Sequence, residues 1–279
     1  MTVRVERERQ ASGSDVAVVT LDDPARRNIL SPAMVSALVD ATTELGADPG
    51  VGAVVVTGAP PAFCGGAPLA SLADASALGS GPAGPAGPAS GRAGTAGDPR
   101  AALLAIYAAF EAVERLPMPT IAAVNGAAVG AGLNLALACD VRVAARSARF
   151  DSRFLSLGLH PGGGHTWSLA RLVGPGAAHA MVLFGEVVGG GDAERIGLAW
   201  RTVDDDELIE AAIALARQAA GAPSVLARRT KATMRATRAL ASREDATLVE
   251  LDAQLWSLAE PELAARVVDA ARARGPRRG

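Results

Sequence analysis

The glycine-bearing turn that ends in Gly130-Ala131-Gly132 is the part of the chain best suited to chemistry. We expect a strand over residues 120–124 to run into this turn and a helix to open at the three residues. The first N–H groups of a helix have no intrahelical acceptor, and the helix dipole adds partial positive charge there. Such a point can hold an anion or the developing oxyanion of a thioester carbonyl. Taken alone, a Gly-x-Gly pattern is also typical of tight strand–helix packing, and the full dinucleotide fingerprint is missing.

A second turn, Phe63-Cys-Gly-Gly-Ala67-Pro-Leu69, follows another predicted strand, and on its own it could be a simple turn. Cys64 lies within it, but a nucleophilic cysteine needs a lowered pKa, and the sequence offers no specific partner for that. Cys139 is the only other cysteine. Two cysteines make neither a zinc pattern nor a disulfide framework, so we interpret both as small buried apolar residues.

The two turns belong to an ordered set of motifs that resembles the crotonase (enoyl-CoA hydratase/isomerase) superfamily. Each motif alone is weakly specific, but the set covers residues 15–200 in order and is interrupted only by one loop. Besides the two turns, it comprises P-x-x-x-N-x-L-S at residues 24–31, A-x-D-x-x-x-A at 138–144, the glycine loop and following helix at 157–174, and A-x-x-x-G-L at 193–198.

The resemblance implies a fold, a ligand and an assembly. The fold is an α/β spiral of ββα units, and the ligand is a coenzyme A thioester, bound as substrate without a separate cofactor or metal. Homotrimers, often paired into hexamers, are implied as well, with C-terminal helices covering the site. Within that site the resemblance assigns the oxyanion hole to the backbone N–H groups of Ala67 and Ala131.

The resemblance also suggests which residues line the path of coenzyme A. These residues are Ala25, Arg26, Arg27, Ala67, Pro68, Leu69, Ala70 and Ala131. Arg26 or Arg27 could meet the phosphates, because a guanidinium suits a bidentate contact with phosphate oxygens. A solvated surface pair is an equally good interpretation of the two arginines.

The sequence departs from the family at the positions of the acid and the base. Hydration of an enoyl thioester needs a base to activate water and an acid to protonate the α-carbon. Matched to the family, the two hydratase glutamates fall at Asn134 and Phe154, and a third carboxylate position falls at Gly162. None of these side chains can take a proton, although Asn134 could hydrogen-bond a water or a substrate oxygen. We therefore do not expect efficient hydration.

Other titratable side chains could replace the missing pair. His160 and His165 flank the glycine loop, where the ordinary pKa of histidine suits acid–base work. Structural roles are nevertheless the commoner interpretation for both histidines. Among the nearby carboxylates, a helix or loop cap is the commoner interpretation of Asp151, and a solvated charge is the commoner interpretation of Asp74 and Asp98, which border the flexible insertion.

The elements around these sites predict a mixed α/β core over residues 1–203 and a helical trimerisation or lid region over 204–279. Strands are expected at 3–9, 16–21, 51–57, 120–124 and 198–203. One more strand is expected after the helix that opens at residue 130, and it ends at residue 145. Helices are expected from Ser31-Pro32 to about 46, near Pro68, and at 100–116, 164–173, 176–184, 192–196, 206–220, 223–240, 243–258 and 261–274. Residues 75–98, rich in Gly, Ala, Pro and Ser, read as a flexible insertion, with an ordered lid as the alternative.

Composition limits the class of protein. The chain is 49% hydrophobic with a net charge of -2, which argues against a disordered chain and against a dedicated nucleic-acid binder. No apolar run approaches the roughly 20 residues of a membrane span, and the N-terminus lacks the apolar region of a secretory signal. We expect a soluble cytoplasmic protein.

Two functions remain open at this stage, and a degraded hydratase with residual activity is a weaker third option. The first is an enzyme of fatty-acid or other acyl-CoA metabolism that stabilises a thioester enolate and acts as a lyase, isomerase or hydrolase with non-standard catalytic residues. The second is a non-catalytic acyl-CoA binder that serves as a carrier, sensor or partner subunit.

Overall fold

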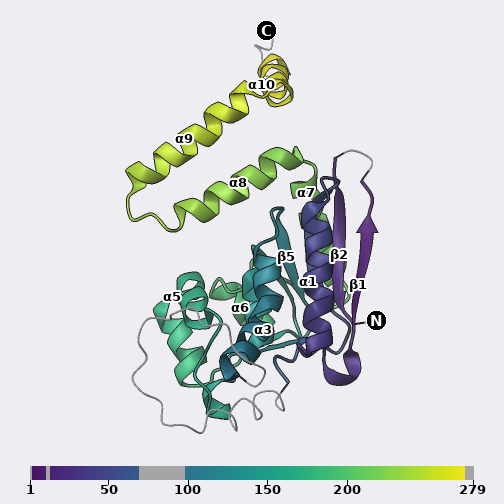
Figure 1. The fold of residues 1–279 in the computed structure, drawn as a ribbon, viewed down its shortest axis with the longest axis vertical. Coiled ribbons are helices and arrows are strands. Elements are labelled where there is room, and N and C mark those ends of the chain that lie inside the picture. The colour runs from purple at the N-terminus through teal and green to yellow at the C-terminus, as the bar shows by residue number, and fades with distance from the viewer. Residues whose placement is uncertain (1, 11–12, 69–97, 274–279) are drawn as a thin grey trace.

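The computed structural model of the protein describes residues 2–10, 13–68 and 98–273 (Figure 1). Leu69, Ala70, Asp74 and nearly all of the predicted insertion at 75–98 lie outside these residues, as does the helix predicted near Pro68. None of the helices that the structure describes has both the length and the apolarity needed to cross a bilayer.

A six-stranded sheet forms the centre of the fold, in the order β1-β2-β3-β5-β7-β10. Its strands are β1 (Val3–Glu8), β2 (Asp15–Leu21), β3 (Val51–Gly58), β5 (Thr120–Val124), β7 (Val141–Ala145) and β10 (Arg201–Val203). The β1–β2 pair is antiparallel and the other pairs are parallel. β3 is buried along its whole length, as expected for a parallel strand covered on both faces. The predicted α/β class is confirmed.

Helices pack against this sheet where the sequence predicted them. α1 (Pro32–Ala47) contacts β1 and β2, α3 (Pro99–Glu114) contacts α1, and α7 (Leu208–Ala220) contacts β2, β3 and β5. α1 begins as expected, with Pro32 at its first position and the Ser31 hydroxyl accepting a hydrogen bond from the Met34 N–H at 3.3 Å.

A second, four-stranded sheet was not predicted from the sequence. It consists of β4 (Ala62–Cys64), β6 (Ala127–Val129), β8 (Arg149–Asp151) and β9 (Val188–Gly189), in that order. Strands of two or three residues are too short to show an alternating pattern. This sheet matters for the site because β4, β6 and β8 are parallel, so the turns that follow them meet at one edge.

Several element boundaries differ from the prediction for physical reasons. The strand expected at 198–203 is limited to β10. The helices expected at 164–173 and 176–184 form α5 (His165–Leu183), which is broken at Gly174 with φ of 77°, just before Pro175. A turn at Asn125-Gly126 leads first into β6, so α4 (Ala131–Ala138) begins after this short strand rather than directly after β5. α6 (Gly190–Arg195) and two short 3-10 helices, Pro24–Arg26 and Leu155–Leu157, complete the core.

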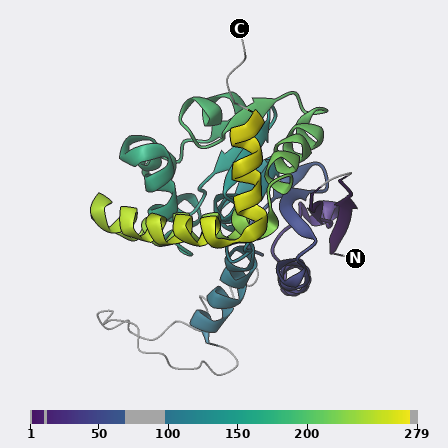
Figure 2. The same ribbon diagram turned by 90° about the horizontal axis from the view of Figure 1, so that it is seen from above.

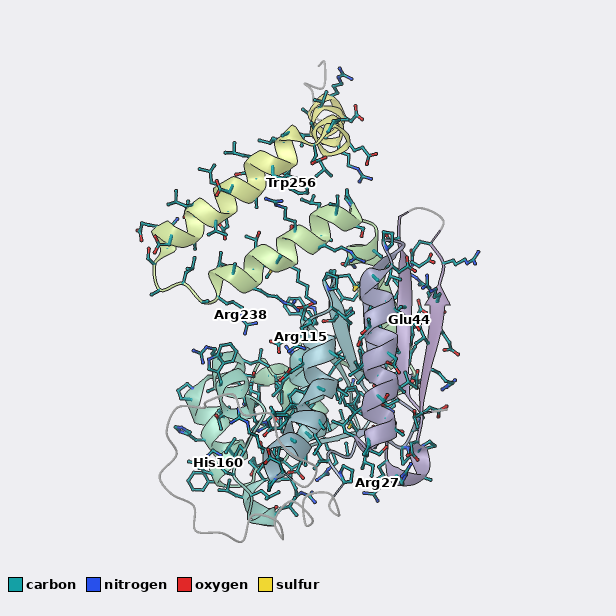
Figure 3. All side chains as sticks on the ribbon, in the orientation of Figure 1. Arg27, Glu44, Arg115, His160, Arg238 and Trp256 are labelled. Carbon is teal, nitrogen blue, oxygen red and sulfur yellow. The ribbon has the colours of Figure 1, made fainter. Side chains whose placement is uncertain are left out.

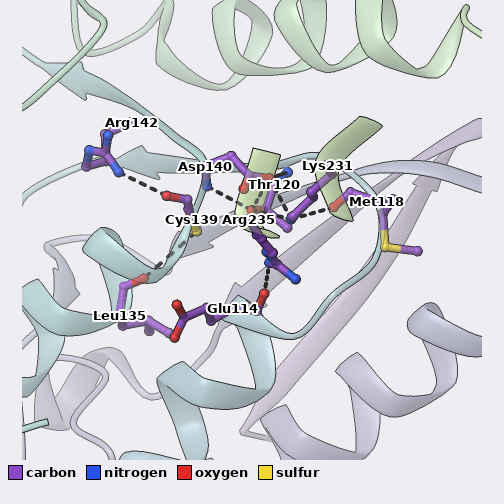
Figure 4. Close-up of polar contacts among 9 residues, drawn as sticks. All are labelled: Glu114, Met118, Thr120, Leu135, Cys139, Asp140, Arg142, Lys231 and Arg235. Carbon is purple, nitrogen blue, oxygen red and sulfur yellow. Dashed lines mark hydrogen bonds and ion pairs between the residues drawn. The ribbon is translucent and has the colours of Figure 1, made fainter. Parts of the chain in front are cut away.

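Three further helices stand apart from the sheet layers: α8 (Ser224–Thr237), α9 (Arg243–Ala259) and α10 (Pro261–Ala273) (Figures 1 and 2). Polar contacts attach α8 to the core. The Lys231 ammonium lies 2.6 Å from the Asp140 carboxylate and donates to the Met118 carbonyl at 2.7 Å (Figure 4). Arg228 donates to the Gly46 and Asp48 carbonyls at 3.0 and 2.7 Å. The interpretation of residues 204–279 as a trimerisation or lid region stays a prediction.

Candidate functional site

A cavity of about 650 Å³ opens at the edge of the second sheet. The turns after β4, β6 and β8 form one side of it, and α3 and the loop before α5 form the other. The lining residues are Ile29, Gly65, Gly66, Ala67, Pro68, Leu103, Ile106, Tyr107, Val129, Gly130, Ala131, Asn134, Ser152, Arg153, Phe154, Leu157, Leu159, His160 and Gly162. The cavity therefore brings together the two turns that the sequence singled out.

The backbones of the two turns are in direct contact. Gly66 has φ of 96°, and a Cβ there would lie 2.6 Å from the Val129 carbonyl oxygen and 3.7 Å from the Ala131 nitrogen. A Cβ at Gly132 would lie 2.1 Å from the Cys64 carbonyl oxygen. Only glycine permits this approach at both positions. The result is that Ala67 and Ala131 both line the same cavity.

Ala131 is the first residue of α4, so its N–H has no acceptor within the helix. The preceding Gly130, with φ of 51°, turns the chain so that the helix begins at the cavity wall. A partial positive charge at this helix start favours a negatively charged oxygen. The geometry is that of a site able to receive an oxyanion between two neighbouring backbone turns.

The segment expected to guide coenzyme A is hydrogen-bonded to the first of these turns. The Gly65 N–H donates to the Arg27 carbonyl, and the Leu30 N–H donates to the Gly66 carbonyl, both at 2.8 Å. The buried Asn28 amide holds the base of the segment by donating to the Ala59 and Ala62 carbonyls at 2.8 and 2.7 Å. The segment and the turn thus form one unit.

Only some of the residues expected to contact coenzyme A lie at the cavity. Pro68 lines the cavity, whereas Ala25, Arg26 and Arg27 are exposed and lie outside its lining. Arg26 already pairs with Asp23 at 2.6 Å. Figure 3 shows Arg27 and His160 at the same end of the molecule.

The two positions matched to family glutamates both face the cavity. Asn134 lines it from α4, and Phe154, half-buried, forms an apolar part of its wall. Among the described lining residues, none is an aspartate or a glutamate. His160 is exposed at the cavity and donates from Nδ1 to the Pro161 carbonyl at 2.7 Å. Gly162 is pressed against the Tyr107 hydroxyl, where a Cβ would come within 2.3 Å.

The other candidates have structural roles in the described part of the chain. Burial raises the pKa of the Cys64 thiol to about 12, which leaves it unreactive. Cys139 is buried in the same way, and its pKa is also raised to about 12. Asp151 is buried and paired with Arg153, whose Nε donates to it at 2.8 Å. Asp98 caps the start of α3. Nowhere in the described ranges do three or more His, Cys, Asp or Glu side chains cluster as a metal site would require.

A cluster of three hydrogen-bonded side chains, Ser152, His165 and Asn134, lies directly behind the cavity wall. His165, only 1% exposed, meets the Asn134 Oδ1 with its Nδ1 at 2.7 Å and the Ser152 Oγ with its Nε2 at 2.8 Å. The Asn134 Nδ2 donates to the Gly162 carbonyl at 2.9 Å. Burial lowers the pKa of His165 to about 4, so the imidazole is neutral at neutral pH.

Ser152 was missed by the sequence reasoning. It carries no motif, and its hydrogen bond to His165 spans 13 residues of loop. The sequence held no local signal for it, because Ser152 reaches Gly130 only through the pairing of the three-residue strands β6 and β8. His165 was considered, but its link to Asn134 was not foreseen.

Comparison with known proteins identifies the family. The family model described as enoyl-CoA hydratase/isomerase matches residues 11–81 and 95–261. The chain belongs to the enoyl-CoA hydratase/isomerase family. It is 48% identical to a probable enoyl-CoA hydratase of Mycobacterium tuberculosis, over 91% of this chain and 93% of that protein. It is also 34% identical to the 1,2-epoxyphenylacetyl-CoA isomerase of Escherichia coli, over 75% of this chain and 74% of that enzyme.

Solved structures of the enoyl-CoA hydratase/isomerase family share the fold. An enoyl-CoA hydratase from Bacillus anthracis superposes with a TM-score of 0.83 at 27% identity, covering 99% of this chain and 98% of its own. The predicted crotonase resemblance and the crotonase-like fold are therefore confirmed.

Proposed function

We propose that the protein binds an acyl-CoA thioester and holds its carbonyl oxygen between the backbone N–H groups of Ala67 and Ala131. The observation that carries this proposal is the contact between the two glycine turns at the wall of one cavity, in a chain of the enoyl-CoA hydratase/isomerase family. The largely apolar remainder of the lining suits an acyl chain.

The proposed chemistry is stabilisation of an enolate or another oxyanion of the bound thioester, in fatty-acid or other acyl-CoA metabolism. One donor of an oxyanion hole is worth roughly 10²–10³-fold in rate. We do not expect efficient hydration, because Asn134 and Phe154 cannot transfer protons and the described lining offers no carboxylate. A lyase, isomerase or hydrolase step with non-standard residues is the proposal.

The second candidate function is a non-catalytic acyl-CoA binder that acts as a carrier, sensor or partner subunit. The lack of a carboxylate among the described lining residues favours it. Affinity alone does not separate the two functions, since both need the same cavity. Turnover measured beside affinity does.

The test is crotonyl-CoA hydration by the wild type and by an Asn134→Glu/Phe154→Glu double variant, with affinity measured by calorimetry. Formation of the 3-hydroxyacyl product is followed by mass spectrometry, so that loss of the enoyl group by any other route is not counted. We expect the wild type to bind the thioester without efficient hydration and the double variant to gain hydration.

A Ser156→Glu variant is the matched control, because it adds a carboxylate to the same loop outside the cavity lining. If this control hydrates crotonyl-CoA as fast as the double variant does, Asn134 and Phe154 are not the positions of the family's acid and base. Rapid hydration by the wild type would contradict the proposal about the missing acid and base, and absence of binding would contradict the proposed ligand.

The proposed assembly is a homotrimer or a dimer of trimers. An apolar stripe on α9 supports a partner surface there, since Leu248, Leu251, Leu255 and Leu258 are all at least 44% exposed and share one helix face. Light scattering of a Leu251→Asp/Leu255→Asp variant tests this, with a shift from trimer or hexamer to monomer as the expected result. An unchanged mass would place the interface elsewhere.

A further inference from the structure

Ser152 lies next to the helix start that holds Ala131. The parallel pairing of β6 with β8 sets Val129 opposite Asp151, and the Gly130 N–H donates to the Asp151 carbonyl at 2.9 Å. Ser152 is therefore beside Gly130, one residue before the proposed oxyanion donor. The next residue, Arg153, has φ of 51°, so the chain turns sharply immediately after the serine. Ser152 is among the residues that line the cavity at this turn, with 2% of its surface exposed.

The hydrogen-bond partners fix the state of the imidazole behind Ser152. The Gly162 carbonyl can only accept, so the Asn134 Nδ2 faces it and the Asn134 Oδ1 faces His165. That oxygen can only accept as well, so the His165 Nδ1 carries the proton. Because His165 is neutral, its Nε2 has a free lone pair, and it accepts the proton of the Ser152 hydroxyl at 2.8 Å.

The order hydroxyl, imidazole, amide is the arrangement that activates a nucleophile. The base takes the proton of the hydroxyl, and a third group holds the base in the correct tautomer. Here Ser152, Asn134 and Phe154 all line the cavity and all contact His165, Phe154 by an edge-on ring contact with 4.9 Å between centroids. His165 is thus one layer behind the wall, with its Nε2 directed at the serine hydroxyl.

We propose that Ser152 is a nucleophile that cleaves the thioester bond of a bound acyl-CoA, with His165 as its base and Asn134 positioning the imidazole. This inference rests on the proposed acyl-CoA ligand and narrows its chemistry to acyl transfer and hydrolysis. The Ser152 Oγ attacks the thioester carbonyl carbon while its proton passes to His165 Nε2. The carbonyl oxygen becomes an oxyanion that accepts from the Ala67 and Ala131 N–H groups.

The tetrahedral intermediate then breaks its carbon–sulfur bond. Coenzyme A leaves as a thiol with the proton from His165, and the acyl group remains on Ser152 as an ester. Water attacks this ester, gives a proton to His165, and releases the carboxylic acid as the proton returns to Ser152. The sum is acyl-CoA plus water giving a carboxylic acid plus CoA thiol, without a carboxylate base, a metal or an oxidant.

Saturated butyryl-CoA is the decisive probe, because a thioester without a double bond cannot be hydrated. Thiol release is followed with a disulfide reagent. Cys64 and Cys139 are at most 3% exposed, so the folded protein contributes little background. The acyl group on the protein is measured by intact mass and located by peptide mapping. We expect release of thiol and an added acyl mass on Ser152.

A second probe, a fluorophosphonate, reacts with activated serines without any need for coenzyme A. We expect it to label Ser152. Ser152→Ala should abolish labelling and lower thiol release about 10³-fold or more. Ser156→Ala, in the same loop but outside the cavity lining, should change neither. Asn134→Leu should slow labelling roughly 10-fold or more, because the His165 Nδ1–H loses the acceptor that fixes the tautomer of the imidazole.

The outcomes separate this inference from the proposed ligand. Tight binding of butyryl-CoA with no thiol release above the Ser152→Ala level and no phosphonate on Ser152 would overturn the nucleophile and leave acyl-CoA binding intact. Labelling of Ser152 without binding of butyryl-CoA or crotonyl-CoA would support the activated serine and overturn the CoA ligand. Because Ser152→Ala removes a single oxygen, a folded variant is expected, and Ser152→Cys provides a second one that should retain acyl transfer.

Discussion

Two of the buried polar clusters in the described part of the chain connect segments distant in sequence but are built differently. One, at α8, is charged: Lys231 meets Asp140, the Met118 carbonyl and the Thr120 hydroxyl at 2.6, 2.7 and 3.4 Å. The other, behind the cavity of about 650 Å³, is neutral and runs from Ser152 through His165 to Asn134.

The two clusters differ in what remains available for chemistry. An ammonium has three N–H donors, and Lys231 has an oxygen for each of them. Asp140 also accepts from the Thr120 N–H and hydroxyl at 2.8 and 3.0 Å. In the neutral cluster Ser152 donates its single proton to His165, and no hydrogen bond from another described group to its hydroxyl oxygen is present. The charged cluster is therefore suited to attachment of a helix, and the neutral one to reactivity.

Replacing Lys231 by Met tests the charged cluster and should have the largest effect on stability. The change leaves Asp140 without its cation, and removing one partner of a buried pair costs about 3–5 kcal/mol. We expect a loss of about 3 kcal/mol in the free energy of unfolding, the lower end of that range, because the Asp140 side chain is 37% exposed and water can solvate it. Urea denaturation measures the loss, and acyl-CoA affinity should be unchanged.

Arg195→Met is the matched control for this prediction. Arg195 pairs with Asp192 at 3.0 Å, but both side chains are well exposed, and such pairs are worth less than about 1 kcal/mol. Equal losses in the two variants would show that the Lys231 pair does not anchor α8.

The neutral cluster makes stability depend on pH. Burial lowers the pKa of His165 from 6.5 to about 4 in the folded protein, so the unfolded chain binds a proton first as the pH falls. The stabilisation is complete above pH 6.5 and is lost as the pH falls toward 4. The loss between pH 7 and pH 5 should be about 2 kcal/mol.

A His165→Gln variant should lack this dependence, while His160→Gln, at the exposed rim, should retain it. The measurement is the urea midpoint of each protein at several pH values between 7 and 5. Parallel curves for the wild type and His165→Gln would contradict the buried neutral imidazole.

Much of the fold could be predicted from the sequence because its long elements have strong local signals. β3 is a continuous apolar run, and α1 has a serine cap followed by proline. The small second sheet could not be predicted, since its strands are two or three residues long and form only through pairing with one another. The two turns were nevertheless found, because their glycines and their order in the chain are visible without knowing the sheet.

The candidate site divides in the same way. The positions of Ala67, Ala131, Asn134 and Phe154 at one cavity follow from motifs, and the structure places all four there. The role of the neutral cluster does not follow from any motif. The hydrogen bonds of His165 to the Asn134 amide and the Ser152 hydroxyl distinguish a buried base from a loop residue. These partners come from α4 and from the end of β8, far from His165 in sequence.

Asn134→Leu tests whether the amide holds the neutral cluster together. The change keeps the branched shape of the side chain but leaves the His165 Nδ1–H and the Gly162 carbonyl without their partner. A buried polar group without a partner costs about 1–3 kcal/mol, and we expect about 1.5 kcal/mol, because the position borders the cavity, where water can enter. Thermal unfolding measures it, and a neutral result would mean that the imidazole finds another acceptor.

Ser152→Ala should have the smallest effect on stability and thereby sharpen the contrast between the clusters. It removes one hydrogen bond to His165, worth about 1 kcal/mol or less. If the neutral cluster served only to stabilise the fold, this small loss in the urea midpoint would be the whole consequence. If Ser152 is the nucleophile, the same variant loses thiol release and phosphonate labelling while it unfolds almost as the wild type does. A loss of stability as large as that of Lys231→Met would instead make the serine an anchor like the ammonium at α8.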